Sequence, residues 1–263
     1  MAADLTWLGD AGLKFDIDGA VATVTLARKE RRNAMTPRMW HGLARIGSEL
    51  LPPDTRVVVV KGDGPSFCAG IDLRTFNPDG VPGEPKTLRP DQPGFEDQVA
   101  GYQAGYLWLR NPQFVSIAAV QGHAIGAGFQ LALACDLRVL AEDATLCMKE
   151  PALGLVPDLT GTKPLVEIVG LPRAIELCLT ARTISATEAR ELLLAEDVVK
   201  DLDAAVAKLA ADLQRTVPAA ARATKELLAQ ARANTLEEQA LAERVAQKQL
   251  LLSLRPEPAG TPA

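Results

Sequence analysis

Residues 116–161 constrain the fold more than any other part of the chain, because short apolar runs alternate there with glycine turns. Ile117–Val120 has the length and composition of a buried strand, and Gln121-Gly122 then turns the chain. A Gly-Ala-Gly turn at 126–128 leads into Phe129–Cys135, an apolar run compatible with a buried helix. Such a turn leaves N–H groups unpaired at the positive end of the helix dipole, where they can hold a developing negative charge.

Two carboxylates follow this turn on loops. Short strands are expected at Leu137–Leu140 and Thr145–Met148, and Glu150 comes soon after the second. Asp158 lies further on, in a segment rich in glycine and proline. Backbone donors followed by two loop carboxylates supply the groups needed to stabilise an oxyanion while a proton moves.

Four pieces of the chain together resemble the enoyl-CoA hydratase/isomerase (crotonase) family. They are SIAAVQGHAIGAGFQLALACDLRVLAEDATL, which contains the glycine turn, KEPALGLVPD, which contains both carboxylates, FCAGIDL at 67–73 and ARKERRNAM at 27–35. Each piece alone is a weak signal, but the four stand in the family's order and spacing, from about Leu13 to Val199. On this basis the chain is identified as a member of that family.

The resemblance implies an α/β fold, a crotonase-type spiral of ββα units with C-terminal helices that serve trimer assembly. It implies a spiral core at 1–199 with an acyl-CoA site and a helical region at 200–255. Composition predicts a disordered tail at 256–263. The repeats are not evident in the residue pattern, which by itself gives a strand-rich first part and a helical last part.

Local signals predict several elements without the resemblance. Lys14–Leu26 alternates around Asp18-Gly19, which predicts an antiparallel hairpin. Thr36-Pro37 predicts a helix start, and the valines of Arg56–Lys61 predict a strand buried on both faces. Further helices are expected at 99–110, 160–169, 172–180, 203–216, 219–233 and 236–252, and one follows the capping box at 185–188.

Composition excludes several functional classes. The net charge of −5 over 263 residues argues against nucleic acid or an anionic membrane as a general partner. The four cysteines are widely spaced in apolar contexts, which indicates reduced thiols in a cytoplasmic protein. With two histidines and no CxxC pair, a zinc site is not expected. The residue pattern predicts neither a signal peptide nor a membrane span.

By resemblance, two backbone N–H groups form an oxyanion hole for the thioester oxygen of an acyl-CoA. They belong to Ile71, in the first motif, and to Ala127, in the Gly-Ala-Gly turn. Preorganised donors stabilise the enolate that forms when a proton leaves the carbon beside the thioester, and each is worth about 3 kcal/mol or more. Either motif taken alone is equally consistent with an ordinary tight turn.

Glu150 falls at the family's second catalytic glutamate, aligned through the following LGLVP. Where hydratases of the family carry another glutamate, this chain has Gln130. A hydratase uses both carboxylates to hold and deprotonate water, whereas Gln130 can hydrogen-bond but cannot accept a proton. A single glutamate at the second position is typical of family members that shift a double bond, so the sequence favours isomerisation.

Asp158 occupies a position that differs among members of the family. By resemblance, it is a proton-relaying aspartate in dienoyl-CoA isomerases and the nucleophile in aryl-CoA dehalogenases. A Glu150/Asp158 pair can divide acid and base roles if the surroundings separate the two pKa values. The alternative is that Asp158 only caps the N-terminus of the following helix.

The remaining candidates concern binding. Arg28 lies in a basic loop that can meet CoA phosphates, although a solvated loop explains its charge as well. Cys68 has no evident base nearby and is expected to be inert. By resemblance, the backbone near the first motif cradles the adenine and pantetheine, and the residues assigned to substrate binding with Arg28 are Ala69, Gly70, Asp72, Leu73 and Gly126.

The sequence thus predicts an acyl-CoA enzyme that stabilises a thioester enolate and transfers protons, with Glu150 as main base and isomerisation favoured. Three alternatives remain: an enoyl-CoA hydratase in which Gln130 orients water, a non-catalytic acyl-CoA binding protein, and a hydrolase or dehalogenase with Asp158 as nucleophile. A dinucleotide fold is set aside because Leu131 stands where its fingerprint needs glycine or alanine. No metal or cofactor is expected, since coenzyme A is part of the substrate, and the resemblance implies a homotrimer or a dimer of trimers.

Overall fold

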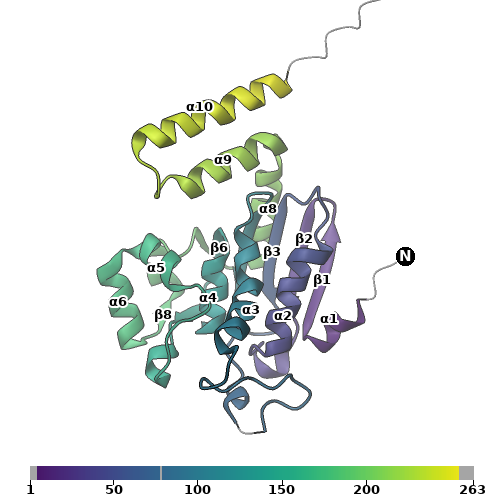
Figure 1. Cartoon of the computed structure of the whole chain (residues 1–263), viewed down its shortest axis with the longest axis vertical. Helices are drawn as coiled ribbons and strands as arrows, with labels where there is room; N and C mark the ends of the chain where they lie inside the picture. The colour runs from purple at the N-terminus through teal and green to yellow at the C-terminus, as the bar shows by residue number, and fades with distance from the viewer. Residues whose placement is uncertain (1–4, 78, 255–263) are drawn as a thin grey trace, which may run out of the picture.

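The computed structural model describes residues 5–77 and 79–254, in which helices surround two β-sheets (Figure 1). In the larger sheet all neighbouring strands are parallel except the first pair, which forms a hairpin. In spatial order its strands are β1 (Leu13–Asp18), β2 (Val21–Leu26), β3 (Val57–Gly62), β4 (Val115–Val120), β6 (Leu137–Ala141) and β9 (Asp197–Val199). The smaller sheet contains β5 (His123–Ile125), β7 (Thr145–Cys147) and β8 (Ile184–Ser185).

The α-helices alternate with strands first and then follow one another. They are α1 (Thr6–Asp10), α2 (Pro37–Arg45), α3 (Phe95–Leu107), α4 (Ala127–Ala134), α5 (Thr162–Val169), α6 (Leu171–Thr180), α7 (Ala186–Glu191), α8 (Leu202–Gln214), α9 (Pro218–Gln230) and α10 (Leu236–Ser253). Short 3-10 turns include η3 (Leu73–Phe76) and η5 (Glu150–Leu153), which carry predicted site residues or adjoin them. The expected α/β class is confirmed.

The chain repeats one path through the two sheets. From β4 in the large sheet it passes to β5 in the small sheet and then to α4, and from β6 it passes to β7 and then to α5. An earlier turn of the same path leaves β3 and touches the small sheet only where Cys68 pairs with Ala124. The result is the spiral that the resemblance implied.

Strand β3 is buried on both faces, as predicted. Val58 and Val60 face the main core between the sheet and the helices. Val57 and Val59 face a second cluster, which α8 closes with Val206. The hairpin prediction is also confirmed, since Asp18 pairs with Val21 across the turn between β1 and β2.

The last two helices lie beyond the end of the large sheet, where α10 stacks on α9 (Figure 1). Lys225 anchors α9: its ammonium donates to the carbonyls of Asn111 at 2.8 Å and Phe114 at 2.7 Å and pairs with Asp136 at 2.6 Å. The helices predicted at 203–216, 219–233 and 236–252 correspond to α8, α9 and α10. The domain division at 199/200 stays a prediction, and the tail predicted at 256–263 lies outside the described residues.

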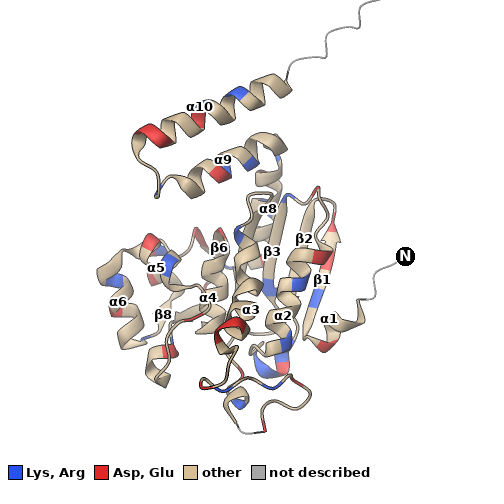
Figure 2. Ribbon diagram, viewed as in Figure 1, with Lys and Arg blue, Asp and Glu red and all other residues tan. Residues whose placement is uncertain are grey.

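Charged residues of both signs are scattered over the ribbon, and α4 has none (Figure 2). Within the described residues, no helix combines the length and apolarity that crossing a bilayer requires. Nor does that part of the chain gather three His, Cys, Asp or Glu side chains in an arrangement able to hold a metal ion.

Helices α2 and α3 approach each other closely through a glycine. A Cβ atom at Gly105 would stand 2.6 Å from the carbonyl oxygen of Trp40. One turn earlier in α3, a Cβ atom at Gly101 would meet only the edge of the His41 ring, at 3.3 Å. Two glycines of one helix therefore differ in whether a methyl group fits.

We predict that Gly105→Ala destabilises the protein by about 1–3 kcal/mol, because backbone atoms must move to admit the methyl group. Gly101→Ala is the matched control and should be neutral or stabilising by up to about 1 kcal/mol, since alanine favours the helix. Urea unfolding of both variants measures the difference. Equal free energies of unfolding for the two variants would contradict this packing.

Candidate active site

Two glycine turns that are distant in the sequence meet where Cys68 pairs with the small sheet. The Cys68 N–H donates to the His123 carbonyl at 2.8 Å, and the Ile125 N–H donates to the Cys68 carbonyl at 3.0 Å. These bonds place the turn at Gly70 beside the turn that begins α4. The structure thus brings together the two motifs that the resemblance assigned to one oxyanion hole.

Glycine is required on both sides of this junction. Gly70 has φ +99°, and a Cβ atom there would stand 2.9 Å from the Ile125 carbonyl oxygen. A Cβ atom at Gly128 would stand 2.4 Å from the Cys68 carbonyl oxygen. Any side chain at either position would push the two turns apart.

The N–H groups of Ile71 and Ala127 are unused at this junction. Their neighbours are paired: the Gly126 N–H donates to the Cys147 carbonyl at 2.8 Å, and the Asp72 N–H donates to the Met35 carbonyl at 2.9 Å. Within residues 5–77 and 79–254, neither the Ile71 nor the Ala127 N–H has an acceptor. Two unpaired donors therefore lie on adjoining turns, one of them in the first turn of α4.

A tyrosine that the sequence did not single out holds this turn in place. The Tyr106 hydroxyl donates to the Ala127 carbonyl at 3.1 Å and accepts from the Trp40 indole N–H at 3.1 Å. Tyr106 is fully buried, and burial raises its pKa well above the usual value, so it stays a neutral donor. The sequence predicts a helix around Tyr106, but no local pattern indicates a hydrogen bond to a residue as distant as Ala127.

Gln130 lies at the centre of the polar part of the site. Its Nε2 donates to Glu150 Oε1 at 2.7 Å. Its Oε1 accepts from the backbone N–H groups of Leu159 at 2.9 Å and Gly161 at 3.2 Å. Gln130 is fully buried in α4, so the amide joins Glu150 to the loop that carries Asp158.

Glu150 is a buried carboxylate with one free oxygen. It is 9% exposed, and within the described residues its Oε2 has no hydrogen-bond partner. Burial raises its pKa, nearby backbone N–H groups and the Gln130 amide lower it, and the charge of Asp158 raises it further. The carboxylate lies against the glycine turn, since a Cβ atom at Gly126 would stand 3.0 Å from Oε1.

Asp158 faces solvent, yet the surrounding protein desolvates its carboxyl enough to raise its pKa. Its carbonyl accepts from Gln103 Nε2 of α3 at 2.6 Å. The alternative reading as a helix cap is wrong, because the N-cap of α5 is Gly161 and no side chain caps that helix. The Asp158 side chain is therefore not used in holding the next helix.

Arg28 and Asp72 lie together at the edge of the first motif. Asp72 accepts from the Arg74 guanidinium at 2.6 Å and from Arg28 at 3.2 Å, and these bonds hold its pKa well below the usual range. Arg28 also donates to the Ala34 carbonyl, so much of its hydrogen-bonding capacity is used within the protein. The binding roles assigned to Arg28, Ala69, Gly70, Asp72, Leu73 and Gly126 stay predictions.

The cysteines fit the expectation of unreactive thiols. Within the described residues all four are free, and Cys178 is the one that is only half-buried. Burial raises the pKa of Cys68 to about 12, so this thiol stays protonated beside the first motif.

We predict that Glu150→Gln stabilises the fold at neutral pH. The pKa of Glu150 is higher in the folded protein than in the unfolded chain. The stability that this carboxyl contributes is therefore present below its unfolded pKa and is lost as the pH rises through its folded pKa. The amide introduced at position 150 still accepts a hydrogen bond from Gln130. The gain in the free energy of unfolding should therefore shrink towards about pH 4, where the wild-type carboxyl is also neutral. Denaturant unfolding at both pH values tests this, with the exposed Glu142→Gln as control. An equal gain at both pH values would contradict the assignment.

Comparison with known proteins agrees with this geometry. The family model for enoyl-CoA hydratase/isomerase matches residues 16–254. A Thermobifida fusca YX protein crystallised in complex with acetoacetyl-CoA is 59% identical, with a TM-score of 0.93 over 97% of this chain and 100% of that one. A structure from the same organism in complex with CoA is also 59% identical, with a TM-score of 0.92 over 97% and 98% of the two chains.

More distant relatives carry two different activities. The peroxisomal Delta(3,5)-Delta(2,4)-dienoyl-CoA isomerase of Arabidopsis thaliana is 30% identical over 86% of this chain and 83% of its own length. An enoyl-CoA hydratase from Bacillus anthracis is 29% identical, with a TM-score of 0.81 over 91% of both chains. The predicted crotonase-type fold is confirmed, and the chain belongs to the enoyl-CoA hydratase/isomerase family of enzymes.

Proposed function

We propose that this enzyme shifts a double bond of an enoyl-CoA thioester by removing and returning one proton, with Glu150 as main base. The observation that carries the proposal is the pairing of the buried Glu150 carboxylate with the amide of Gln130. A proton-transfer reaction needs one base beside the thioester, whereas activation of water between two carboxylates needs a second base that Gln130 cannot supply.

The N–H groups of Ile71 and Ala127 are the donors for the thioester oxygen in this proposal. Both lack an acceptor within the described residues and lie on adjoining turns. As the proton leaves the carbon beside the thioester, negative charge builds on that oxygen. Fixed donors stabilise it without reorganisation, each by about 3 kcal/mol or more.

Asp158 is the partner of Glu150 in moving the proton. Its carboxyl lies on a loop tied to the Gln130 amide, and the charges of the two carboxylates interact. Desolvation raises both pKa values, so each group exchanges a proton more readily near neutral pH than a free carboxylate does. We assign the first transfer to Glu150 because it is the more buried group.

Coenzyme A binding extends the proposal to the first motif. The main chain of Ala69, Gly70 and Leu73 and the ion pair of Arg28 with Asp72 adjoin the donor of Ile71. The structures of the Thermobifida fusca YX protein with CoA and acetoacetyl-CoA support a CoA thioester as the ligand. We therefore propose that these residues and Gly126 contact the CoA part of the substrate.

The hydratase alternative meets an obstacle in the same amide. Gln130 is fully buried, its Oε1 accepts from two backbone N–H groups, and its Nε2 donates to Glu150. An amide held in this way has no exposed atom with which to orient water. A non-catalytic binding protein would have no need of a buried, partly unpaired carboxylate beside its oxyanion turns.

We predict that the wild-type protein converts a 3-enoyl-CoA or a 3,5-dienoyl-CoA, without adding water, to the isomer in which a double bond is conjugated with the thioester carbonyl. Glu150→Gln should lower this turnover about a thousandfold because the base is lost, and Asp158→Asn about tenfold or more. The exposed Glu142→Gln serves as control and should leave it unchanged. Mass spectrometry of the thioesters measures each product.

The same assay contains the outcomes that oppose the proposal. Addition of water to a 2-enoyl-CoA at a higher rate than isomerisation would make the chain a hydratase. Binding of all three thioesters without conversion would favour the carrier alternative. Unchanged turnover in Glu150→Gln would refute the role given to that side chain.

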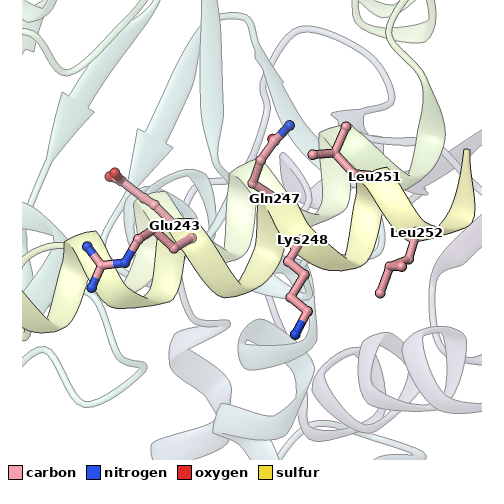
Figure 3. A pocket seen from close by; sticks show the side chains of 6 residues that line it. Glu243, Gln247, Lys248, Leu251 and Leu252 are labelled. Atoms are coloured by element: carbon pink, nitrogen blue, oxygen red, sulfur yellow. The ribbon is translucent and has the colours of Figure 1, made fainter.

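We further propose that the chain assembles as a homotrimer or a dimer of trimers through its last helices. Figure 3 looks onto α10, where Glu243, Arg244, Gln247, Lys248, Leu251 and Leu252 line a shallow hollow. Large apolar side chains on this helix are 49–87% exposed in the single chain. They are Leu236, Leu241, Val245, Leu251 and Leu252. Apolar exposure on this scale is typical of a face that another subunit covers.

We predict that Leu241→Lys combined with Val245→Lys shifts the protein from an assembly to a monomer. The two positions lie one helical turn apart on α10, so the substitutions place two charges on one face. Glu142→Lys, in an exposed turn outside α10, is the control and should keep the assembly. Sedimentation velocity measures all three, and a monomeric wild-type protein would contradict the proposal.

A further inference from the structure

We propose that Gln130 is a positioning residue with two tasks. It leaves Oε2 as the single reactive oxygen of Glu150, and it fixes the position of Asp158 relative to Glu150. The inference rests on the proposed proton transfer and gives this buried amide a specific task. It follows from three hydrogen bonds made by the same side chain and from the lack of space for a Cβ atom at Gly161 beside it.

The orientation of the amide is fixed by its partners. The N–H groups of Leu159 and Gly161 both point at one end of Gln130, and two donors require an oxygen there. Nε2 must therefore face Glu150. Rotating the amide by half a turn would set Nε2 against two N–H donors and leave Oε1 against the Glu150 carboxylate.

This orientation makes the two oxygens of Glu150 unequal. Oε1 accepts from Nε2 at 2.7 Å in the ionised form, and it remains the better acceptor in the neutral acid as the carbonyl oxygen. A proton taken up by Glu150 therefore resides on Oε2, which has no partner within the described residues. Oε2 is therefore the atom that removes the proton from the carbon beside the thioester, the transfer assigned to Glu150 in the proposed reaction.

The amide also sets the position of the second carboxylate. Its Oε1 holds the N–H of Leu159, directly after Asp158, while Gln103 holds the Asp158 carbonyl from α3. Gly161 permits the contact, because a Cβ atom there would stand 2.6 Å from Gln130 Cγ. The Gln130 amide is thus confined between Glu150 and the loop of Leu159 and Gly161, and the positions of both carboxylates depend on it.

Four titratable groups of the described residues interact electrostatically with Glu150. They are Asp158, Tyr106, Cys147 and Cys178. Burial raises the pKa of the phenol and of both thiols, so these three groups stay neutral at physiological pH. Asp158 is then the charged neighbour, and an acid introduced at position 130 would be a second one.

Two substitutions separate the functions of the amide. Gln130→Glu keeps an acceptor for Leu159 and Gly161 but replaces the donor to Glu150 with a carboxyl group. Gln130→Met removes the donor and the acceptor at similar volume. Gln121→Met is the matched control, because Gln121 also holds a loop through its amide, donating to the Gly62 carbonyl at 2.7 Å and to that of Gly64 at 3.0 Å.

The experiment titrates Glu150 by ¹³C NMR in full-length protein labelled at glutamate carboxyl carbons, with the signal assigned by its loss in Glu150→Gln. We expect Gln130→Glu to raise the Glu150 midpoint by about one pH unit or more, because two buried carboxylates cannot both ionise freely. Gln130→Met should raise it less, through loss of the donor. Gln121→Met should leave it unchanged.

Amide hydrogen exchange in the same samples tests the coupling to the loop. We expect the N–H groups of Leu159 and Gly161 to exchange about tenfold faster in Gln130→Met and near the wild-type rate in Gln130→Glu. An unchanged Glu150 midpoint in Gln130→Glu would overturn the inference. So would unchanged exchange of both amides in Gln130→Met.

Neither measurement uses a substrate, so the positioning role of Gln130 and the proposed reaction can each be refuted without the other. If the titration and the exchange behave as expected while the isomerisation assay gives only hydration, Gln130 positions Glu150 but the proposed reaction is wrong. If isomerisation occurs while both readings stay at wild-type values in the variants, the reaction stands and the positioning role is wrong.

Discussion

The pairing of Cys68 with Ala124 is the contact on which the site depends. Through it, one turn of the spiral presents Ile71 and the next presents Ala127, so two donors distant in sequence lie on adjoining turns. The pairing tolerates no side chain at Gly70 or Gly128, since a Cβ atom at Gly70 would stand 2.9 Å, and one at Gly128 2.4 Å, from a backbone oxygen of the opposite turn. The fold thus creates the donor pair with main-chain atoms alone.

The polar side of the site depends in turn on where α4 begins. The helix starts at the same glycine turn and carries Gln130 one turn further on, fully buried. Because that amide joins Glu150 to the loop of Asp158, one short helix positions both the N–H of Ala127 and the carboxylate of Glu150. An apolar helix with a single glutamine is consistent with this, since a buried amide must be fully hydrogen-bonded.

The sequence predicted most of the fold, and the exceptions have physical causes. The hairpin around Asp18, the N-cap at Thr36 and the buried strand at 57–62 carry strong local signals. The strand His123–Ile125 does not, because three residues are too few for an alternating pattern to emerge. The repeats were not evident for the same reason: each turn contributes only a few residues to the small sheet. Tyr106 and the three bonds of Gln130 depend on packing between distant segments, which a local pattern does not contain.

The central claim is that Glu150 moves a proton at the carbon beside a CoA thioester while main-chain donors hold the oxygen. The most direct test is exchange of the C2 hydrogens of a saturated thioester, butyryl-CoA, in heavy water, because it requires an enolate and no particular double bond. The account predicts that the wild-type protein catalyses this exchange and that Glu150→Gln slows it about a hundredfold or more. Exchange that is as fast in Glu150→Gln as in the wild-type protein would contradict it.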